Sequence, residues 1–421
     1  MSIAPTRLKC LRYFTLGLLG CGFGLLAGSE ALAQTPTESE KIGLDEIKIA
    51  ANARNTSAAT TLLTHETSEA RALPATPSIA RDSLAQRHAN PTFERAVDFH
   101  GFFDLEYEVD NRDRDGKIGD FDVHHFNVIS TFKFSPRAMV LGEIEYEHGI
   151  EHESGTTVGL IALERAWLRL QIDKKLNLSF GKFLTPYGIY NTVHDASPTF
   201  LFTKLPYSLY DRHLNASGKS ERDYPKFFAG VQANGLLPFA AGELEYFAYY
   251  GNGKGSKPYE KDDNPNKAIG LRLRYLESLE RIKLGASWFR GQNGNDAHTM
   301  QQILASDLEW NQGPLQVQIE GTWNRFERLV NGAKNGAHRR AFGYYAQTSV
   351  KLFGRLRPFA RYDAYDPDHQ GSSDVERTIA LGLNLGIYKD VFLKFENHFR
   401  SSQAPSYKEH ELFVASIAAG F

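Results

Sequence analysis

Charged side chains recur at every second position along much of this chain. The basic members of the pattern are Arg165, Arg169, Arg272, Arg274, Lys283, Arg361 and Lys394. The acidic members are Asp98, Asp104, Glu106, Glu143, Glu145, Glu147, Glu243 and Glu245. Residues two apart on a strand share one face, so these groups could line a wet wall that steers ions and polar solutes. The acids and the bases concentrate on different predicted strands, which suggests two walls of opposite charge. The other interpretation is a solvated face whose charges are simply hydrated.

A second group of residues could bind a metal ion. Oxygen-bearing side chains alternate in the segment 111–122, and the donors are Asn111, Asp113, Asp115, Asp120 and Asp122. With glycine at the sixth position, the spacing resembles an EF-hand loop, which wraps Ca²⁺ in oxygen ligands. The segment differs from that pattern because it ends in Asp rather than Glu. No cofactor is expected apart from Ca²⁺ here, and a solvated hairpin with an Asp-Gly turn is the competing interpretation.

Nucleophilic catalysis is the third chemistry to consider. His194, Asp195 and Ser197 lie close in sequence, as do Asp211 and His213. A catalytic triad is recognised by geometry, however, and proximity in sequence is no evidence for one. The nucleophile motif Gly-x-Ser-x-Gly does not occur in the sequence. We therefore expect no enzymatic activity, and a hydrolase of the lipase or protease kind remains as an alternative.

The composition limits the class of protein that can carry these residues. The chain has 421 residues, of which 23% are charged and 12% aromatic, and its formal net charge is −2. This balance gives no basic surplus for a nucleic-acid partner. The mean hydropathy of −0.40 also argues against a bundle of transmembrane helices, because each would need about 20 apolar residues in a row.

The N-terminal region differs in character from the rest of the chain. Residues 1–33 combine a basic start, an apolar stretch and the small-residue cleavage pattern Ala31-Leu32-Ala33, which predicts a cleaved secretory signal peptide. A lipoprotein signal at Cys21 is the alternative. Residues 34–95 are rich in Ala, Thr, Ser and Glu and lack apolar periodicity, which predicts a disordered periplasmic segment.

From residue 96 onward the apolar pattern has a period of two. Val140 and Ile144, for example, alternate with glutamates. The pattern gives about sixteen strands joined by alternately tight and long connections, and the connection at 235–242 should be longer than a tight turn. An even number of strands with short turns on one side predicts an all-β fold, a transmembrane antiparallel barrel over residues 96–421 with short periplasmic turns and long outside loops. Closure leaves no strand edge unpaired in lipid.

Three runs of sequence then carry a family resemblance. They are residues 142–148, residues 163–168 and residues 181–191, the last of which contains a Pro-x-Gly turn. Together they resemble the phosphate-selective porin (O/P-like) superfamily of bacterial outer-membrane proteins. The resemblance implies a homotrimeric porin in outer-membrane lipid and lipopolysaccharide. The terminal Phe421, in phase with the outward residues of the last strand, resembles an assembly signal, so the barrel-assembly machinery is an expected partner.

The segment 184–225 is the predicted constriction. In the superfamily a long third loop folds into the channel, and here the matching residues are Tyr187, Lys204, Asp211, Arg212, Lys219 and Arg222. We therefore expect passive diffusion of small polar or anionic solutes, phosphate among them, through a water-filled barrel that this loop narrows. Phosphate selectivity does not follow directly, because the basic inner residues are mixed with acids. The alternatives are an outer-membrane hydrolase of the lipase or protease kind and a plugged structural or adhesive barrel.

Overall fold

The computed structural model describes residues 95–111, 119–153, 156–193, 197–214, 220–253, 264–292, 299–330, 333–369, 374–403 and 409–421. The predicted signal peptide and nearly all of the segment that follows it lie outside these residues. Within the described part of the chain, no helix has the length and the apolar character that are needed to cross a membrane.

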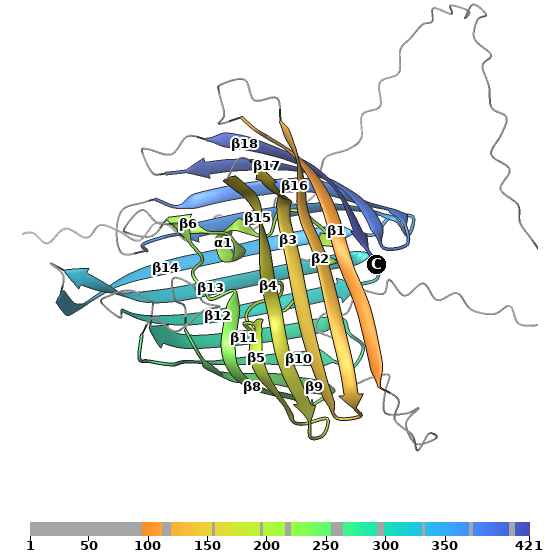
Figure 1. Ribbon diagram of the computed structural model, residues 1–421. Helices are drawn as coiled ribbons and strands as arrows, with labels where there is room; N and C mark the ends of the chain where they lie inside the picture. The colour runs from red at the N-terminus through yellow and green to blue at the C-terminus, as the bar shows by residue number, and fades with distance from the viewer. Residues whose placement is uncertain are drawn as a thin grey trace, which may run out of the picture. The chain divides into compact units, whose positions relative to one another are not determined.

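Sixteen antiparallel strands of the described chain close into one barrel, as the alternating pattern predicted (Figure 1). Strand β1 (Ala96–Asp110) pairs with the last strand, β18 (His410–Gly420), so the ring has no free edge. Each other strand pairs with its neighbours along the chain, and β5 pairs with β8. The remaining wall strands are β2 (Asp120–Ser135), β3 (Ala138–Glu153), β4 (Thr156–Gln171), β5 (Asn177–Leu184), β8 (Phe227–Phe239), β9 (Gly242–Gly251), β10 (Ala268–Glu277), β11 (Ile282–Gln292), β12 (Met300–Gln312), β13 (Leu315–Val330), β14 (Ala333–Val350), β15 (Leu356–Asp366), β16 (Glu376–Tyr388) and β17 (Val391–Ser402).

One predicted connection is shorter in the structure. The prediction of a long turn at 235–242 is wrong. Strand β8 continues to Phe239, and only Ala240 and Ala241 separate it from β9. Pro238 lies within β8 although proline cannot donate a ladder hydrogen bond. It lies beyond Asn234, the last residue of β8 that pairs with β5, so no bond to that neighbour is lost.

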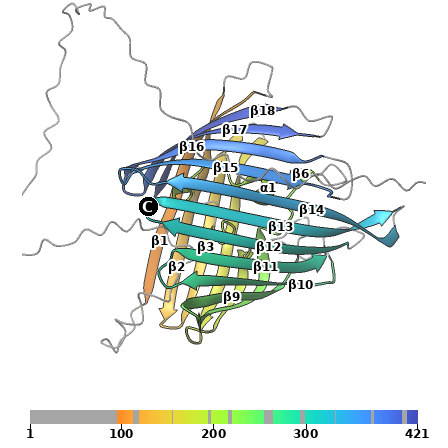
Figure 2. The same ribbon diagram turned by 180° about the vertical axis from the view of Figure 1, so that it is seen from behind.

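The two faces of the wall differ in polarity. In β10, Ile269, Leu271 and Leu273 are exposed on the outer face, whereas Arg272 is buried on the inner face. Figure 2 shows the wall from β9 to β18 as one continuous sheet of strands. Because lipid offers no hydrogen-bond partners, an apolar outer face on fully paired strands is what a bilayer requires.

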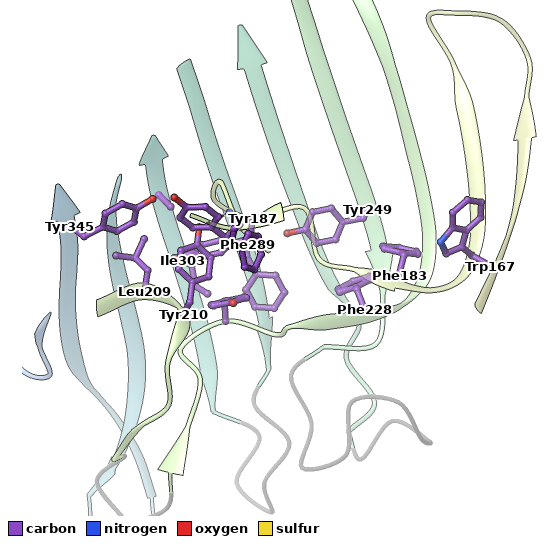
Figure 3. Packing of buried hydrophobic residues seen from close by; sticks show 14 of the residues in the cluster. Trp167, Phe183, Tyr187, Leu209, Tyr210, Phe228, Tyr249, Phe289, Ile303 and Tyr345 are labelled. Atoms are coloured by element: carbon purple, nitrogen blue, oxygen red, sulfur yellow. Dashed lines mark hydrogen bonds between the residues drawn. The ribbon is translucent and has the colours of Figure 1, made fainter. Parts of the chain in front are cut away.

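The main hydrophobic core lies inside the barrel. Figure 3 shows aromatic side chains in a row, from Trp167 on β4 through Phe183 and Phe228 to Tyr345 on β14. Many members of this cluster come from the long segment between β5 and β8 rather than from the wall. The core therefore joins that segment to the inner face of the strands.

Candidate functional site

The segment 185–226, here called the inner loop, leaves the wall after β5 and returns to it at β8. Its two ends are tied together: the backbone N of Thr185 donates to the carbonyl O of Lys226 at 3.0 Å. Nδ2 of Asn191 donates to both of these residues' carbonyls, at 2.7 and 3.1 Å. The sequence had placed the loop at 184–225, one residue away. Its elements are η2 (Ser197–Thr199), α1 (Tyr207–Tyr210), β6 (His213–Leu214) and β7 (Ser220–Glu221).

Aromatic contacts give the inner loop its own packing. Tyr187 stacks on Tyr224 with ring centroids 4.3 Å apart, and Tyr190 meets Phe202 edge-on at 5.0 Å. All four rings are buried. Such pairs add about 0.5–1.5 kcal/mol each beyond the area they bury. The loop is therefore a packed element inside the barrel.

Glu320 on β13 is the main polar contact between the loop and the wall. Its carboxylate accepts hydrogen bonds from the Tyr210 hydroxyl at 2.7 and 2.8 Å and from the Tyr345 hydroxyl at 3.0 Å. The backbone N of Ile189 also donates to Oε1, at 3.2 Å. Burial, followed by the charge of Glu320, raises the pKa of Tyr210, so its hydroxyl keeps its proton. A buried carboxylate is tolerated only with such donors.

The loop also reaches the side of the barrel opposite its own ends. Oγ of Ser208 donates to Asp363 on β15 at 3.0 Å, and Nη2 of Arg361 donates to the Lys204 carbonyl at 3.1 Å. Nζ of Lys394 on β17 donates to the Phe202 carbonyl at 3.0 Å. Both Figure 1 and Figure 2 show α1 within the ring of strands. The inner loop therefore crosses the interior from wall to wall.

Lys204 completes this crossing at β1. Its Nζ lies 2.8 Å from Oε2 of Glu106 and also pairs with Glu108. Burial works against the charge of Lys204, but the two carboxylates outweigh it and raise its pKa above the ordinary value. The loop is thus held by a charged lysine as well as by hydrogen bonds.

The sequence-predicted charged residues lie along the inner face, and most have partners there. Nη1 of Arg272 lies 2.8 Å from Asp307, and Nη1 of Arg274 lies 3.1 Å from Glu245. Further pairs join Arg165 to Glu143, Arg361 to Asp363, His125 to Asp104, and Asp98 to Lys133. Four of the seven predicted bases, Arg165, Arg272, Arg274 and Arg361, therefore meet an acid on their own or a nearby strand. These pairs leave less charge for the two opposed walls that the sequence suggested. Glu145 accepts from Asn127, and Glu147, Glu243 and Lys283 are partly buried.

The charged residues predicted in the constriction loop take several positions. Lys204 reaches β1, and Arg222 donates to the carbonyl of Tyr210 within the loop. Nη2 of Arg400 on β17 lies 3.8 Å from Asp211. Arg212 is exposed, and Lys219 lies outside the described residues. These charges thus serve mainly to fix the loop.

The predicted calcium segment is described only at its two ends. Asp113 and Asp115 lie outside the described residues. Oδ1 of Asn111 accepts from the backbone N of Glu411 at 2.9 Å, and Oδ2 of Asp122 lies 2.7 Å from Nδ1 of His148. Asp120 begins β2. Calcium binding at this segment stays a prediction.

Sequence reasoning missed several inner-face acids. Asp307, Glu320, Asp363 and Glu396 are buried, and Glu396 accepts from the backbone of the loop at Thr203. Asp307 lies two residues from Glu309 in the sequence. Asp363 and Glu396 lie two residues from the predicted bases Arg361 and Lys394, which is the same spacing as in the predicted set. The alternation within each strand was the signal that could have found them.

The residues considered for hydrolysis do not form a described catalytic pair. His194 and Asp195 lie outside the described residues. His213 stacks on Tyr365 at 3.5 Å, and neither of its ring nitrogens has a hydrogen-bond partner among the described residues. Asp211 therefore does not orient His213 as a triad would require.

Comparison with known proteins bears on the fold. No family model matches the chain. An uncharacterized protein of Aquifex aeolicus (strain VF5) is 26% identical over 320 residues, which cover 68% of this chain and 69% of that protein. OmpT of Vibrio cholerae, an outer membrane protein in its in-vitro folded trimer form, has a TM-score of 0.53 at 11% identity and covers 78% of this chain and 100% of its own. The outer membrane channel DcaP of Acinetobacter baumannii has a TM-score of 0.52 at 13% identity, covering 78% of this chain and 97% of its own. The chain has the fold of the bacterial outer-membrane porins.

Proposed function

We propose that this protein is an outer-membrane porin that lets small polar solutes diffuse passively. The observation that carries the proposal is the inner loop, which crosses a closed barrel with an apolar outer face and a charged inner face. A loop fixed at both walls gives a passage a constant width, because its position does not depend on a bound solute. Uptake from outside would then be limited by size and charge.

An anionic preference is the finer part of the proposal. Arg169 on β4 has its guanidinium 4.4 Å from the Trp167 ring centroid, and its Nε donates to Oγ of Ser179 at 3.3 Å. No carboxylate forms an ion pair with Arg169 within the described part of the chain. Arg165, Arg169 and Ser179 line one cavity at the inner face. An arginine fork and a hydroxyl suit carboxylate or phosphate oxygens.

Bilayer recordings test both parts. The untagged chain should give stable conductance in planar bilayers, and a salt gradient should reveal the preferred ion by the sign of the reversal potential. Arg169→Ala should shift that potential toward cation preference, whereas Arg137→Ala, in the exposed β2–β3 turn, should not. Competition between chloride, phosphate and a dicarboxylate would rank the anions. Folded protein without conductance would contradict the channel itself.

A plugged structural barrel is the second candidate, and one observation favours it. The inner loop packs an extensive aromatic cluster against the wall and is bonded to β1, β13, β15 and β17. If these contacts close the passage, the intact chain should not conduct and a chain lacking residues 197–214 should. Conductance of the intact chain would reject the plug.

The proposed setting is the outer membrane, with export by a cleaved signal and assembly as a homotrimer. The porin fold supports the location, and the trimer form of OmpT from Vibrio cholerae supports the assembly. Native mass spectrometry of detergent-extracted protein measures the subunit number and the mass of the mature chain. Membership of the phosphate-selective superfamily is proposed from the three sequence runs alone, and the anion ranking described above would test it.

A further inference from the structure

Three histidines gather on the inner face of β2 and β3, near the barrel end that carries the long connections. The rings of His124 and His125 stack with centroids 4.0 Å apart, and the ring of His148 also stacks on that of His124, at 5.1 Å. The inner loop and its constriction do not account for this group. Histidine side chains are the commonest nitrogen ligands for metal ions in proteins.

Two irregularities of the backbone create the cluster. Asp104 pairs with His125, but the next residue of β1, Leu105, pairs with Val123, so His124 is the extra residue of a β-bulge. The bulge turns His124 and His125 to the same face, where regular alternation would separate them. His148 has a φ of 58°, which is costly for a residue with a side chain. Strained positions of this kind concentrate at functional sites.

Carboxylates complete the group. Oδ1 of Asp104 lies 3.0 Å from Nδ1 of His125, and Oδ2 of Asp122 lies 2.7 Å from Nδ1 of His148. One potential ligand atom from each of Asp104, His124 and His125 lies within 4.8 Å of the other two. The same holds for Asp122, His124 and His148, so the two triads share His124. Side-chain rotation alone could close either triad around one ion.

The charges around the cluster also favour a cation. Asp104 is only 1% exposed, and its Oδ2 has no hydrogen-bond partner among the described residues. A buried carboxylate oxygen without a donor is costly, and a bound cation would remove that cost. Glu106 is near the group, with Oε1 2.9 Å from Nδ1 of His124, but Lys204 already pairs with its other oxygen. Asp104 and Asp122 are the carboxylates of the two triads that share His124, and Glu145 and Glu147 form a further group with His125.

We propose that His124, His125 and His148, with Asp104 and Asp122, bind a divalent transition-metal ion of the Zn²⁺, Ni²⁺ or Cu²⁺ class on the inner wall. Mixed imidazole and carboxylate ligands suit these ions, whereas Ca²⁺ and Mg²⁺ prefer oxygen alone. The side chain of His148 is 51% exposed and that of His125 is 7% exposed. An ion from solvent could therefore reach His148 first and the buried His125 after it. The site requires the folded barrel and does not depend on conductance.

Calorimetric titration of the untagged, detergent-solubilised full chain with ZnCl₂ and with NiCl₂ tests the site. We expect saturable binding that excess CaCl₂ and MgCl₂ do not displace. The double variant His124→Ala/His125→Ala should weaken Zn²⁺ binding by about 10-fold or more, the loss that even outer-shell changes at metal sites produce. His369→Ala is the matched control, because His369 and Asp366 form an exposed histidine–carboxylate pair with Nδ1 3.0 Å from Oδ2.

A more conservative variant separates loss of metal binding from loss of folding. Asp104→Asn keeps the size of the side chain but removes its charge, and it should also weaken Zn²⁺ binding while far-UV circular dichroism stays that of a barrel. Visible absorption of the Co²⁺-loaded chain should show imidazole coordination that the double variant lacks. Equal Zn²⁺ affinity in the original chain and in the folded double variant would overturn the proposal, as would equal loss of binding in His369→Ala. Absence of conductance would leave these binding results unaffected, so the two proposals fail separately.

Discussion

Lys204 of the inner loop extends its ammonium group to Glu106 of β1, with Nζ 2.8 Å from Oε2. The two residues are 98 positions apart in sequence. Glu106 is 3% exposed and the side chain of Lys204 is 25% exposed, so the pair is shielded from most solvent screening. This contact fixes the far side of the loop to the first strand of the barrel.

Lys204→Met should loosen the inner loop. It leaves the Glu106 carboxylate without its cation, and a hydrogen bond to a charged group contributes about 1.5–3 kcal/mol. We expect greater current noise and higher conductance in single-channel recordings. The pKa of Lys204 is raised above the ordinary lysine value of 10.5. The stabilisation by its ion pair with Glu106, the anchor of the loop, is therefore complete below pH 10.5 and is lost as the pH rises through the raised pKa. Noise should therefore rise only in strongly alkaline solution.

The control for this prediction is the double variant Lys204→Met/Glu106→Gln. It removes both charges, so no carboxylate is left buried without a cation. Its free energy of unfolding should lie closer to that of the original chain than that of Lys204→Met does. If Lys204→Met and the original chain have the same conductance and noise, the anchor does not control the passage.

Protonation of His213 at low pH should destabilise the inner loop. Burial lowers the pKa of His213 below its ordinary value of 6.5, although Asp223 and Glu376 act in the opposite direction. Below pH 6.5 the unfolded chain therefore binds more protons than the folded chain does. The stabilisation of the fold by neutral His213 is complete above pH 6.5 and is lost as the pH falls through the lowered pKa. We expect a lower melting temperature at pH 5 than at pH 7.5, measured by calorimetry.

His213→Phe tests the origin of that acid sensitivity. Phenylalanine keeps the stacking on Tyr365, whose centroid lies 3.5 Å from that of His213, but cannot bind a proton. The difference in melting temperature between the two pH values should become smaller. An unchanged difference would assign the effect to other groups.

Arg272→Met should destabilise the barrel wall. Arg272 and Asp307 are 1% and 2% exposed and form two hydrogen bonds, at 2.8 and 3.2 Å. Breaking a buried pair by removing one partner costs about 3–5 kcal/mol. Urea unfolding in detergent should show this loss, and Arg272→Met/Asp307→Leu should recover much of it. Arg281→Met, in an exposed pair with Glu277, should cost below about 1 kcal/mol.

The sequence predicted the wall well because the period of two is a local property. Ile269, Leu271 and Leu273 mark the outer face of β10 without any knowledge of the neighbouring strands. The cross-wall pairs depend on register, which alternation alone does not give. Arg272 reaches Asp307 on β12 across β11, where Gly285 has no side chain to block the Asp307 carboxylate. A pattern within one strand cannot reveal such a contact.

The contacts of the inner loop and of the histidine cluster could not be predicted from the sequence pattern either. The spacing of charges around Lys204 could not identify Glu106 as its partner, because the pairing depends on where the loop crosses the barrel. His124 and His125 interrupt the alternation of their strand, and only the bulge explains why both face inward. The structure is thus most informative where the sequence departs from a regular pattern, because the contacts there cannot be predicted from the pattern.

Gly188, in the Pro-x-Gly turn at the start of the inner loop, should be intolerant of any side chain. Its φ of 57° lies in the left-handed region, which favours glycine. A methyl group here would also overlap with Oε1 of Glu320 and with the hydroxyl of Tyr210. Gly188→Ala should therefore separate the loop from the carboxylate that holds it to β13.

The result should be a folded barrel with a displaced loop, because Gly188 contributes nothing to the wall strands. We expect raised conductance and faster cleavage of the loop by protease, with unchanged far-UV circular dichroism. Gly313→Ala is the matched control, since Gly313 also has a φ of 57° but has no atom within 4 Å of an added Cβ. If both variants behave alike, backbone strain alone explains the effect; if only Gly188→Ala releases the loop, its contact with Glu320 and Tyr210 is what keeps the passage narrow.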